Sequence, residues 1–238
     1  MDYELMMNGT VRIGMRAPDF EAETTMGKVC LADYIGKWVV LFSHPGDFTP
    51  VCTTEIIAFA NADTYFKERN TCLLGLSVDS NSSHLAWLYD IYLRTGIKIP
   101  FPIIADRNGT IARKYGMISN DISNTETVRN VYIIDPEGII RLILIYPMNV
   151  GRCIPEILRA LEALQVSKKC KGSTPANWIM GNPIINPIPQ TISELEKRDE
   201  MVKNEKNGMS WYLSFKNTEK CLDDNTNKNK KLEEKNKR

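Results

Sequence analysis

The sequence contains no C-x-x-C pair and no group of cysteines with the spacing of metal ligands. Its six cysteines are dispersed along 238 residues: Cys30, Cys52, Cys72, Cys153, Cys170 and Cys221. Such dispersion argues against a structural zinc site and against a C-x-x-C disulfide oxidoreductase. We therefore expect no metal and no cofactor. Cys72, inside the apolar run TCLLGLSV, is predicted to be a small buried core residue.

A strong net charge and long hydrophobic runs are also lacking. Thirty Lys and Arg residues balance 29 Asp and Glu residues, which leaves a net charge of +1. That balance argues against a protein that binds nucleic acid through a basic field. No stretch reaches the roughly eighteen apolar residues of a membrane helix, and the first residues do not follow the secretory-signal pattern. We expect neither nucleic acid nor membrane as a partner, and a cytoplasmic location.

Apolar runs alternate with helical patterns over the first two thirds of the chain. Strands are predicted at residues 37–44, 71–78 and 101–106, and helices at 51–70, from after 81 or 82 to Gly96, and at 110–115. Two further strands, 128–135 and 138–146, are joined by the turn PEG, and a helix is predicted at 154–165. This order predicts an α/β fold with a mixed central sheet flanked by helices, and it fits a thioredoxin-like domain.

The composition changes after Gln165. The stretch GSTPANWIMGNPIINPIPQT is typical of an extended arm, ISELEKRDEMVKNEK predicts a short charged helix, and the last residues are almost wholly polar. We expect a thioredoxin-like domain at 1–168, a C-terminal arm at 169–215 and a disordered tail at 216–238. We expect this extended arm to need a partner surface to order it, which indicates oligomerisation.

The stretch SHPGDFTPVC places a single cysteine behind a threonine and a proline. If Thr49 caps a helix, Pro50 takes its first position and Cys52 its third. Free backbone amides and the positive end of the helix dipole stabilise a thiolate there. A thiolate without a neighbouring cysteine suits attack on a small electrophilic oxygen, which yields a sulfenic acid. A capped helix with an incidental cysteine explains the pattern equally well on physical grounds alone.

The segment SHPGDFTPVCTTE resembles the active-site loop of the peroxiredoxins, P-x-x-x-T-x-x-C, with Pro45, Thr49 and Cys52 at the matching positions. The resemblance continues through GLSVDSNSSHLAW, IPFPIIAD, TVRNVYIID and YPMNVGRCIPEILRALEALQ to STPANW, and so covers residues 11–178. Within the family, the chain is most similar to the one-Cys group of the peroxiredoxin 6 type, notably its archaeal and anaerobic-bacterial members with a long C-terminal arm.

The resemblance implies a thiol-dependent peroxidase that reduces hydrogen peroxide and organic hydroperoxides through a cysteine sulfenic acid. Cys52 would be the peroxidatic nucleophile, and Thr49 would hydrogen-bond the peroxide and the thiolate. Pro45 would shield the thiolate from water. Arg129 would bring a guanidinium to the thiolate and to the developing oxygen charge.

Three further residues are candidates for supporting this site. His44 would hydrogen-bond the sulfur or its oxidised forms, Glu55 would orient Arg129, and Arg152 matches a second arginine of the family. For His44, the alternative is a structural histidine at a strand end whose hydrogen bonds are made elsewhere. For Glu55, the alternative is a residue on a solvated helix face. His84 and Trp87 match a family motif but are expected to be packing or interface residues.

The resolving cysteine of the family is missing from its two expected places. Thr174 stands at one of them, and Ser214 stands at the other, either naturally or through a Cys→Ser substitution. Cys221 is a possible resolving residue, Cys170 is a weaker one, and an external thiol is the third option. The chain also lacks the G-x-S-x-G serine of family members with phospholipase activity, since Lys37 stands at its place.

The expected partners are a peroxide and a thiol reductant, either a thioredoxin-like protein or a small thiol. The resemblance also implies homodimers that assemble into a ring, a decamer. The strand at 138–146 is a candidate to pair across the dimer axis, and the alternative is a core strand with no exposed edge. A peroxide sensor or a ring-forming holdase chaperone is the alternative function. Turnover distinguishes them, because a sensor reacts once whereas an enzyme cycles with a thiol donor.

Overall fold

The computed structural model describes residues 11–219 and residue 221. The chain divides into two compact units, Met1–Pro155 and Glu156–Arg238. Most of the tail predicted to be disordered, residues 220 and 222–238, lies outside the described residues. Among the described residues, no helix combines the length and the apolar character needed to cross a bilayer.

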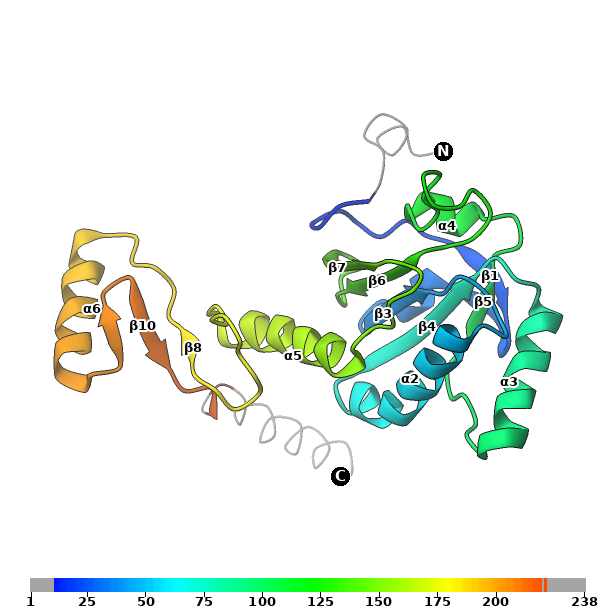
Figure 1. The fold of residues 1–238 in the computed structure, drawn as a ribbon. Coiled ribbons are helices and arrows are strands. Elements are labelled where there is room, and N and C mark those ends of the chain that lie inside the picture. Colours follow the sequence, from blue (N-terminus) through cyan, green and yellow to red (C-terminus); the bar gives the residue numbers. More distant parts are fainter. Residues whose placement is uncertain (1–10, 220, 222–238) are drawn as a thin grey trace, which may run out of the picture. The chain divides into compact units, whose positions relative to one another are not determined.

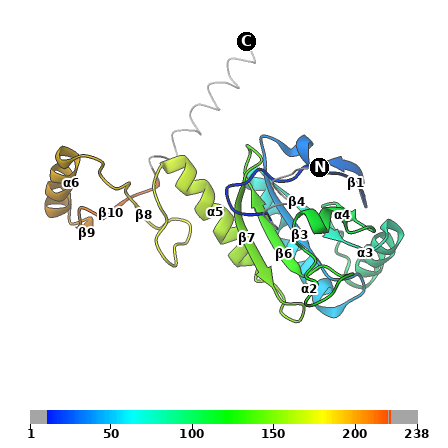
Figure 2. The same cartoon turned by 90° about the horizontal axis from the view of Figure 1, so that it is seen from above.

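A seven-stranded mixed sheet forms the centre of the first unit (Figure 1). Its strand order is β2-β1-β5-β4-β3-β6-β7. The central strand β3 pairs in parallel with β4 and antiparallel with β6, and β7 lies at the edge, beside β6 (Figure 2). The strands are β1 (Glu21–Thr24), β2 (Gly27–Cys30), β3 (Trp38–Ser43), β4 (Thr71–Ser77), β5 (Ile103–Ala105), β6 (Arg129–Ile134) and β7 (Ile140–Tyr146).

Helices cover both faces of this sheet, α2 and α3 on one side and α4 on the other (Figure 1). The alternation of β3 explains both contacts, since successive side chains of a strand point to opposite faces. Val39 and Leu41 belong to the core cluster that includes Ala112 of α4, whereas Phe42 stacks on Phe59 of α2 at 4.1 Å between ring centroids. The helical elements are η1 (Leu31–Tyr34), α2 (Pro50–Glu68), α3 (Asn81–Thr95) and α4 (Thr110–Lys114).

The predicted α/β fold with a mixed sheet is confirmed, and so is the hairpin of β6 and β7. Three details were wrong. The helix predicted at 154–165 continues to Cys170. Helix α3 begins at Asn81, one position earlier than predicted, because Ser80 caps it by accepting a hydrogen bond from the Ser83 amide. Cys72, the second residue of β4, was expected in the core but is only half-buried. The short hairpin of β1 and β2 was not predicted, because its residues show no hydrophobic alternation.

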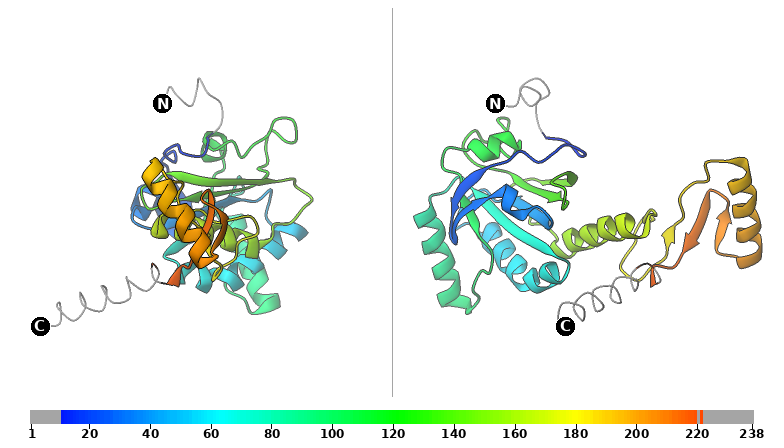
Figure 3. Two further views of the ribbon diagram at one scale, coloured as in Figure 1. Left: turned by 90° about the vertical axis from the view of Figure 1, so that its left-hand side faces the viewer. Right: turned by 180° about the vertical axis from the view of Figure 1, so that it is seen from behind.

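The second unit contains most of α5 (Ile154–Cys170) and a small three-stranded sheet of order β8-β10-β9. Helix α6 (Ile192–Glu205), the predicted charged helix, packs against β9 (Figure 3). A small apolar cluster in this unit contains Val166, Cys170, Trp178 and Ile184. Its strands are β8 (Ile184–Ile185), β9 (Gly208–Ser210) and β10 (Leu213–Lys216).

Replacing Phe59 with alanine tests the packing of α2 on the sheet. Phe59 is fully buried, and truncation of a buried phenylalanine costs about 3–5 kcal/mol of the free energy of unfolding. Tyr65→Ala on the same helix is the matched control, because Tyr65 is 55% exposed. Urea unfolding followed by circular dichroism measures both variants. Equal losses of unfolding free energy in the two variants would contradict the packing of Phe59 between α2 and the sheet.

Candidate active site

The loop between β3 and α2 places Cys52 at the start of a helix. Thr49 is the N-cap residue and Pro50 occupies the first turn, as predicted, and Cys52 follows as the third helical residue with no exposed surface. Phe48, just before the cap, adopts a left-handed backbone with φ of 56°. This conformation turns the chain just before the helix begins, and the first turn of a helix leaves backbone amides without intrahelical partners.

The side chain of Thr49 does not cap the helix. Its Oγ1 instead donates to the backbone oxygen of Gly46 at 2.9 Å. The backbone oxygen of Thr49 accepts from the amide and the hydroxyl of Thr53, at 3.0 and 2.8 Å. Thr49 is therefore fixed between the loop and the helix, and its predicted hydrogen bond to the thiolate is not formed. Pro45, in the same loop, is buried.

Arg129, the first residue of β6, brings a guanidinium to the sulfur. Its Nη1 lies 3.2 Å from Cys52 Sγ and donates to Glu55 Oε2 at 2.8 Å. Its Nε and Nη2 both donate to the backbone oxygen of Met148, at 2.9 and 2.6 Å. Because the guanidinium is anchored at both ends, it faces the sulfur in one orientation. Arg129 is only 2% exposed, so this charge acts away from water.

Glu55, one turn after Cys52, joins two arginines. Arg152 donates to it through its backbone amide at 2.8 Å, through Nε at 2.9 Å and through Nη2 at 2.7 Å. The Nη1 of Arg152 donates to the backbone oxygens of Ser43 and Asn130. The solvated helix face considered as an alternative for Glu55 is excluded, because Glu55 is 3% exposed.

Opposing effects set the charge states of this cluster. Burial alone would raise the pKa of Glu55, but the hydrogen bonds and charge of Arg152, with the charge of Arg129, lower it below its ordinary value. Burial lowers the pKa of Arg152, and Glu55 opposes that shift. Two guanidinium groups and one carboxylate leave one positive charge in excess. A thiolate at Cys52 neutralises this excess without exposing any charge to water.

His44 bonds to a neighbouring aspartate, and no hydrogen bond joins it to Cys52. Its Nε2 lies 3.1 Å from Asp47 Oδ1, and His84 Nδ1 lies 2.9 Å from both Asp47 oxygens. Burial lowers the pKa of His44, with Asp47 opposing the shift. Burial raises the pKa of Asp47, but hydrogen bonds from the two imidazoles outweigh it and lower the pKa. Asp47 is therefore an anion held between the two histidines.

This group is the one place among the described residues where metal-ligand atoms gather, all within 4.8 Å of one another. Asp47 already bonds to both imidazoles, and His84 Nε2 lies 3.2 Å from the Ile104 oxygen, whereas His44 Nδ1 is buried with no hydrogen-bond partner among the described residues. Sequence reasoning missed Asp47 and treated His84 as a packing or interface residue. A signal was present, since the chain has two histidines and both contact this one carboxylate. The ring of His44 also lies 5.2 Å from that of Trp87.

The position where a resolving cysteine was expected, Ser214, and the cysteine considered in its place, Cys221, both belong to the second unit. Ser214 is 1% exposed, and its Oγ accepts hydrogen bonds from Asn186 Nδ2 and Arg198 Nη1, each at 3.1 Å. It is thus part of the packing of the small sheet. Cys221 is joined to Cys170 by a disulfide with a Cα–Cα distance of 5.5 Å.

Comparison with known proteins identifies the family. The AhpC/TSA family model matches residues 13–143. The chain is 56% identical to peroxiredoxin 2 of Caldanaerobacter subterraneus subsp. tengcongensis over 205 residues, 86% of this chain and 92% of the relative. It is 52% identical to peroxiredoxin 2 of Sulfurisphaera tokodaii over 209 residues, 86% of this chain and 95% of the relative.

Solved structures give the same answer. A cysteine-to-serine mutant of peroxiredoxin 6 of Arenicola marina superposes with a TM-score of 0.72 at 36% identity, over 79% of this chain and 88% of that one. The yeast mitochondrial 1-Cys peroxiredoxin superposes with a TM-score of 0.74 at 39% identity, over 87% of this chain and 100% of that one. The predicted resemblance is confirmed: the chain belongs to the AhpC/TSA family, the peroxiredoxins, and is a thiol-dependent peroxidase.

Proposed function

We propose that Cys52 is the peroxidatic nucleophile of this peroxidase and that hydrogen peroxide and organic hydroperoxides are its substrates. The observation that carries the proposal is the contact of 3.2 Å between Arg129 Nη1 and Cys52 Sγ in a buried site. A fixed guanidinium stabilises a thiolate, and it also stabilises the oxygen charge that develops when the O–O bond breaks. The free amides at the start of α2 act in the same direction.

The reaction balances with the residues of this site. The Cys52 thiolate attacks one peroxide oxygen, the O–O bond breaks, and the electron pair leaves on the second oxygen, which takes a proton as alcohol or water. Cys52 becomes a sulfenic acid. In this scheme Thr49 turns its hydroxyl from Gly46 to the peroxide, and Pro45 keeps bulk water from the sulfur.

Three residues hold this arrangement in place. Glu55 orients Arg129 through the contact of 2.8 Å between Glu55 Oε2 and Arg129 Nη1. Arg152 holds the same carboxylate in place, with its Nη2 2.7 Å from Oε2. His44, fixed by Asp47, keeps the loop before Cys52 ordered and faces the oxidised forms of the sulfur. Without Glu55 the two guanidiniums would repel each other, and neither would keep its position.

Cys221 is the proposed resolving residue. The Cys221 thiol attacks the Cys52 sulfenic acid, which releases water and forms a mixed disulfide. The Cys170 thiolate then attacks the Cys221 sulfur, which frees Cys52 as a thiol and leaves Cys170 and Cys221 joined. The support is that these two cysteines are paired in the structure. A thiol reductant completes the cycle.

The assembly proposed is a homodimer that builds a ring, a decamer, with residues 1–168 as peroxidase domain and 169–215 as oligomerisation arm, working in the cytoplasm. The edge position of β7 supports the dimer, because its outer side has no strand partner among the described residues. Ile145 on this strand is 67% exposed. Light scattering that finds a monomer at micromolar concentration would contradict the assembly.

Replacing Cys52 with serine tests the nucleophile directly. Turnover of hydrogen peroxide with a thiol donor should fall to background, because a serine hydroxyl is not ionised at neutral pH, while the thermal unfolding transition stays cooperative. Cys30→Ser is the matched control, because Cys30 lies on β2 and contacts Asp19 rather than the site. Peroxide turnover by Cys52→Ser close to that of Cys30→Ser would refute the mechanism.

Replacing Glu55 with glutamine tests the charge balance. Since the pKa of Glu55 is lowered in the fold from 4.5, its stabilisation is present above that value and is lost as the pH falls through the folded-state pKa. The variant leaves two buried guanidiniums without their carboxylate, at a cost of about 3–5 kcal/mol at pH 7. The difference in the free energy of unfolding between the variant and the wild type should become smaller towards pH 3.

Thermal unfolding of both proteins between pH 7 and pH 3 measures this difference. Glu68→Gln, at the exposed end of the same helix, is the control and should follow the wild type throughout. A difference that stays constant with pH would contradict the ionised state of Glu55.

A further inference from the structure

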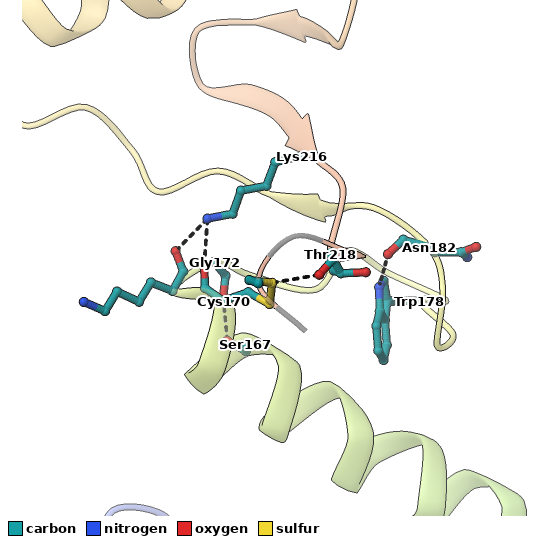
Figure 4. Close-up of a disulfide and its surroundings, with 9 residues drawn as sticks. Ser167, Cys170, Gly172, Trp178, Asn182, Lys216 and Thr218 are labelled. Atoms are coloured by element: carbon teal, nitrogen blue, oxygen red, sulfur yellow. Dashed lines mark hydrogen bonds between the residues drawn. A yellow bond between two sulfur atoms is a disulfide. The ribbon is translucent and has the colours of Figure 1, made fainter. Parts of the chain in front are cut away.

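The second unit holds a disulfide, which takes no part in the attack of Cys52 on the peroxide. Cys170, the last residue of α5, and Cys221 are 51 positions apart and are joined as a disulfide (Figure 4). The loop that this bond closes contains all three strands of the small sheet and helix α6. The distance of 5.5 Å between the Cα atoms lies in the usual range for a disulfide.

The two sulfurs have different surroundings. Cys170 is 6% exposed and belongs to the apolar cluster with Trp178 and Ile184. Cys221 is only partly buried, and the pair lines a cavity of about 1040 Å³ in the second unit. A thiol that enters this cavity therefore meets the Cys221 sulfur first, with Cys170 as the leaving group.

The walls of the cavity indicate the kind of thiol that fits. Apolar contacts come from side chains such as Met201, Met209 and Phe215, and charges of both signs come from Lys206, Lys216, Glu205 and Glu219. The volume, about 1040 Å³, is slightly above the range of about 300–1,000 Å³ for small-molecule sites. A peptide-sized thiol with an ammonium group and carboxylates matches this mixture of charges. A cavity with charges of only one sign would instead select an anion or a cation.

Lys216 adds a specific contact beside the disulfide. Its Nζ donates to the backbone oxygens of Cys170 and Lys171, at 2.8 and 3.2 Å (Figure 4). An ammonium group fixed there favours the approach of a thiolate and the departure of the Cys170 thiolate. After reduction, the Cys221 thiol has an acceptor ready, since its sulfur lies 3.0 Å from the Thr218 oxygen.

We propose that this cavity binds a low-molecular-weight zwitterionic thiol, which reduces the Cys170–Cys221 disulfide by attack on Cys221. The thiolate forms a bond to the Cys221 sulfur, the Cys170–Cys221 bond breaks, and the electron pair leaves on Cys170, which takes a proton from water. A second thiol attacks the mixed disulfide and releases Cys221 as a thiol and the oxidised small thiol. The inference rests on the proposed function in one respect only: the oxidation of Cys52 by peroxide supplies the oxidising equivalents that form this disulfide.

The test uses the full chain with Cys52→Ser, which removes the peroxidatic sulfur and makes the result independent of the mechanism at Cys52. The protein is oxidised with diamide and incubated with glutathione as the probe, then alkylated and mapped by peptide mass spectrometry. A transient glutathione adduct on Cys221, followed by two free thiols at 170 and 221, is the expected result.

Three lysine variants in that background locate the site. Lys216→Met and Lys206→Met, on the cavity wall, should each slow the glutathione reaction roughly fivefold to tenfold, as expected for the loss of one nearby cation. Lys197→Met is the matched control, since Lys197 is exposed on α6 and does not line this cavity. Circular dichroism confirms that all three keep the fold. Dithiothreitol, which carries no charge, should reduce all three at similar rates.

Several outcomes would overturn the proposal: an adduct on Cys170 instead of Cys221, equal glutathione rates in the three variants, or no Cys170–Cys221 bond after diamide. Reduction by thioredoxin but not by glutathione would also overturn it, and would assign the disulfide to a protein dithiol. Peroxide turnover by Cys52→Ser would refute the proposed function but leave this result standing.

Discussion

The carboxylate of Glu55, held between two buried guanidiniums, is the contact on which the site depends. It accepts from Arg152 three times and from Arg129 once, all within 2.9 Å. This arrangement leaves Arg129 fixed against Cys52 and leaves one positive charge for the thiolate to balance. Removing either arginine or the carboxylate would leave a buried charge without its partner, which is the costly case in a protein interior.

The fold assembles this cluster from three separate parts of the chain. Cys52 and Glu55 lie one turn apart on α2, Arg129 begins β6, and Arg152 precedes α5. Strand β3 connects them, because its terminal Ser43 accepts from Arg152 and its Phe42 packs under α2 and against the Arg152 guanidinium at 5.2 Å. The sheet thereby holds the charges at fixed distances while the loop before Cys52 remains the part of the site nearest to solvent.

Local patterns predicted much of this structure, and contacts distant in sequence explain what they missed. Thr49, Pro50 and Cys52 obey helix-capping rules that act within a few residues, so their backbone positions could be derived. Arg129 and Arg152 could be placed beside Cys52 only through the family resemblance. Asp47 and His84 meet across 37 positions, and Cys170 and Cys221 across 51. No periodicity encodes such pairs, and the polar composition after Lys216 suggested disorder where Cys221 is bonded.

The most direct test of the account is a double-mutant cycle on the rate of Cys52 oxidation by hydrogen peroxide, with Glu55→Gln, Arg129→Met and the double variant. Glu55 acts on the sulfur through Arg129, so once Arg129 is absent the loss of Glu55 should change the rate little. Arg129→Met should lower the rate roughly 10²–10³-fold, and the double variant should match it within about twofold. Rate losses that multiply in the double variant would contradict the claim that the carboxylate works by holding this guanidinium on the thiolate.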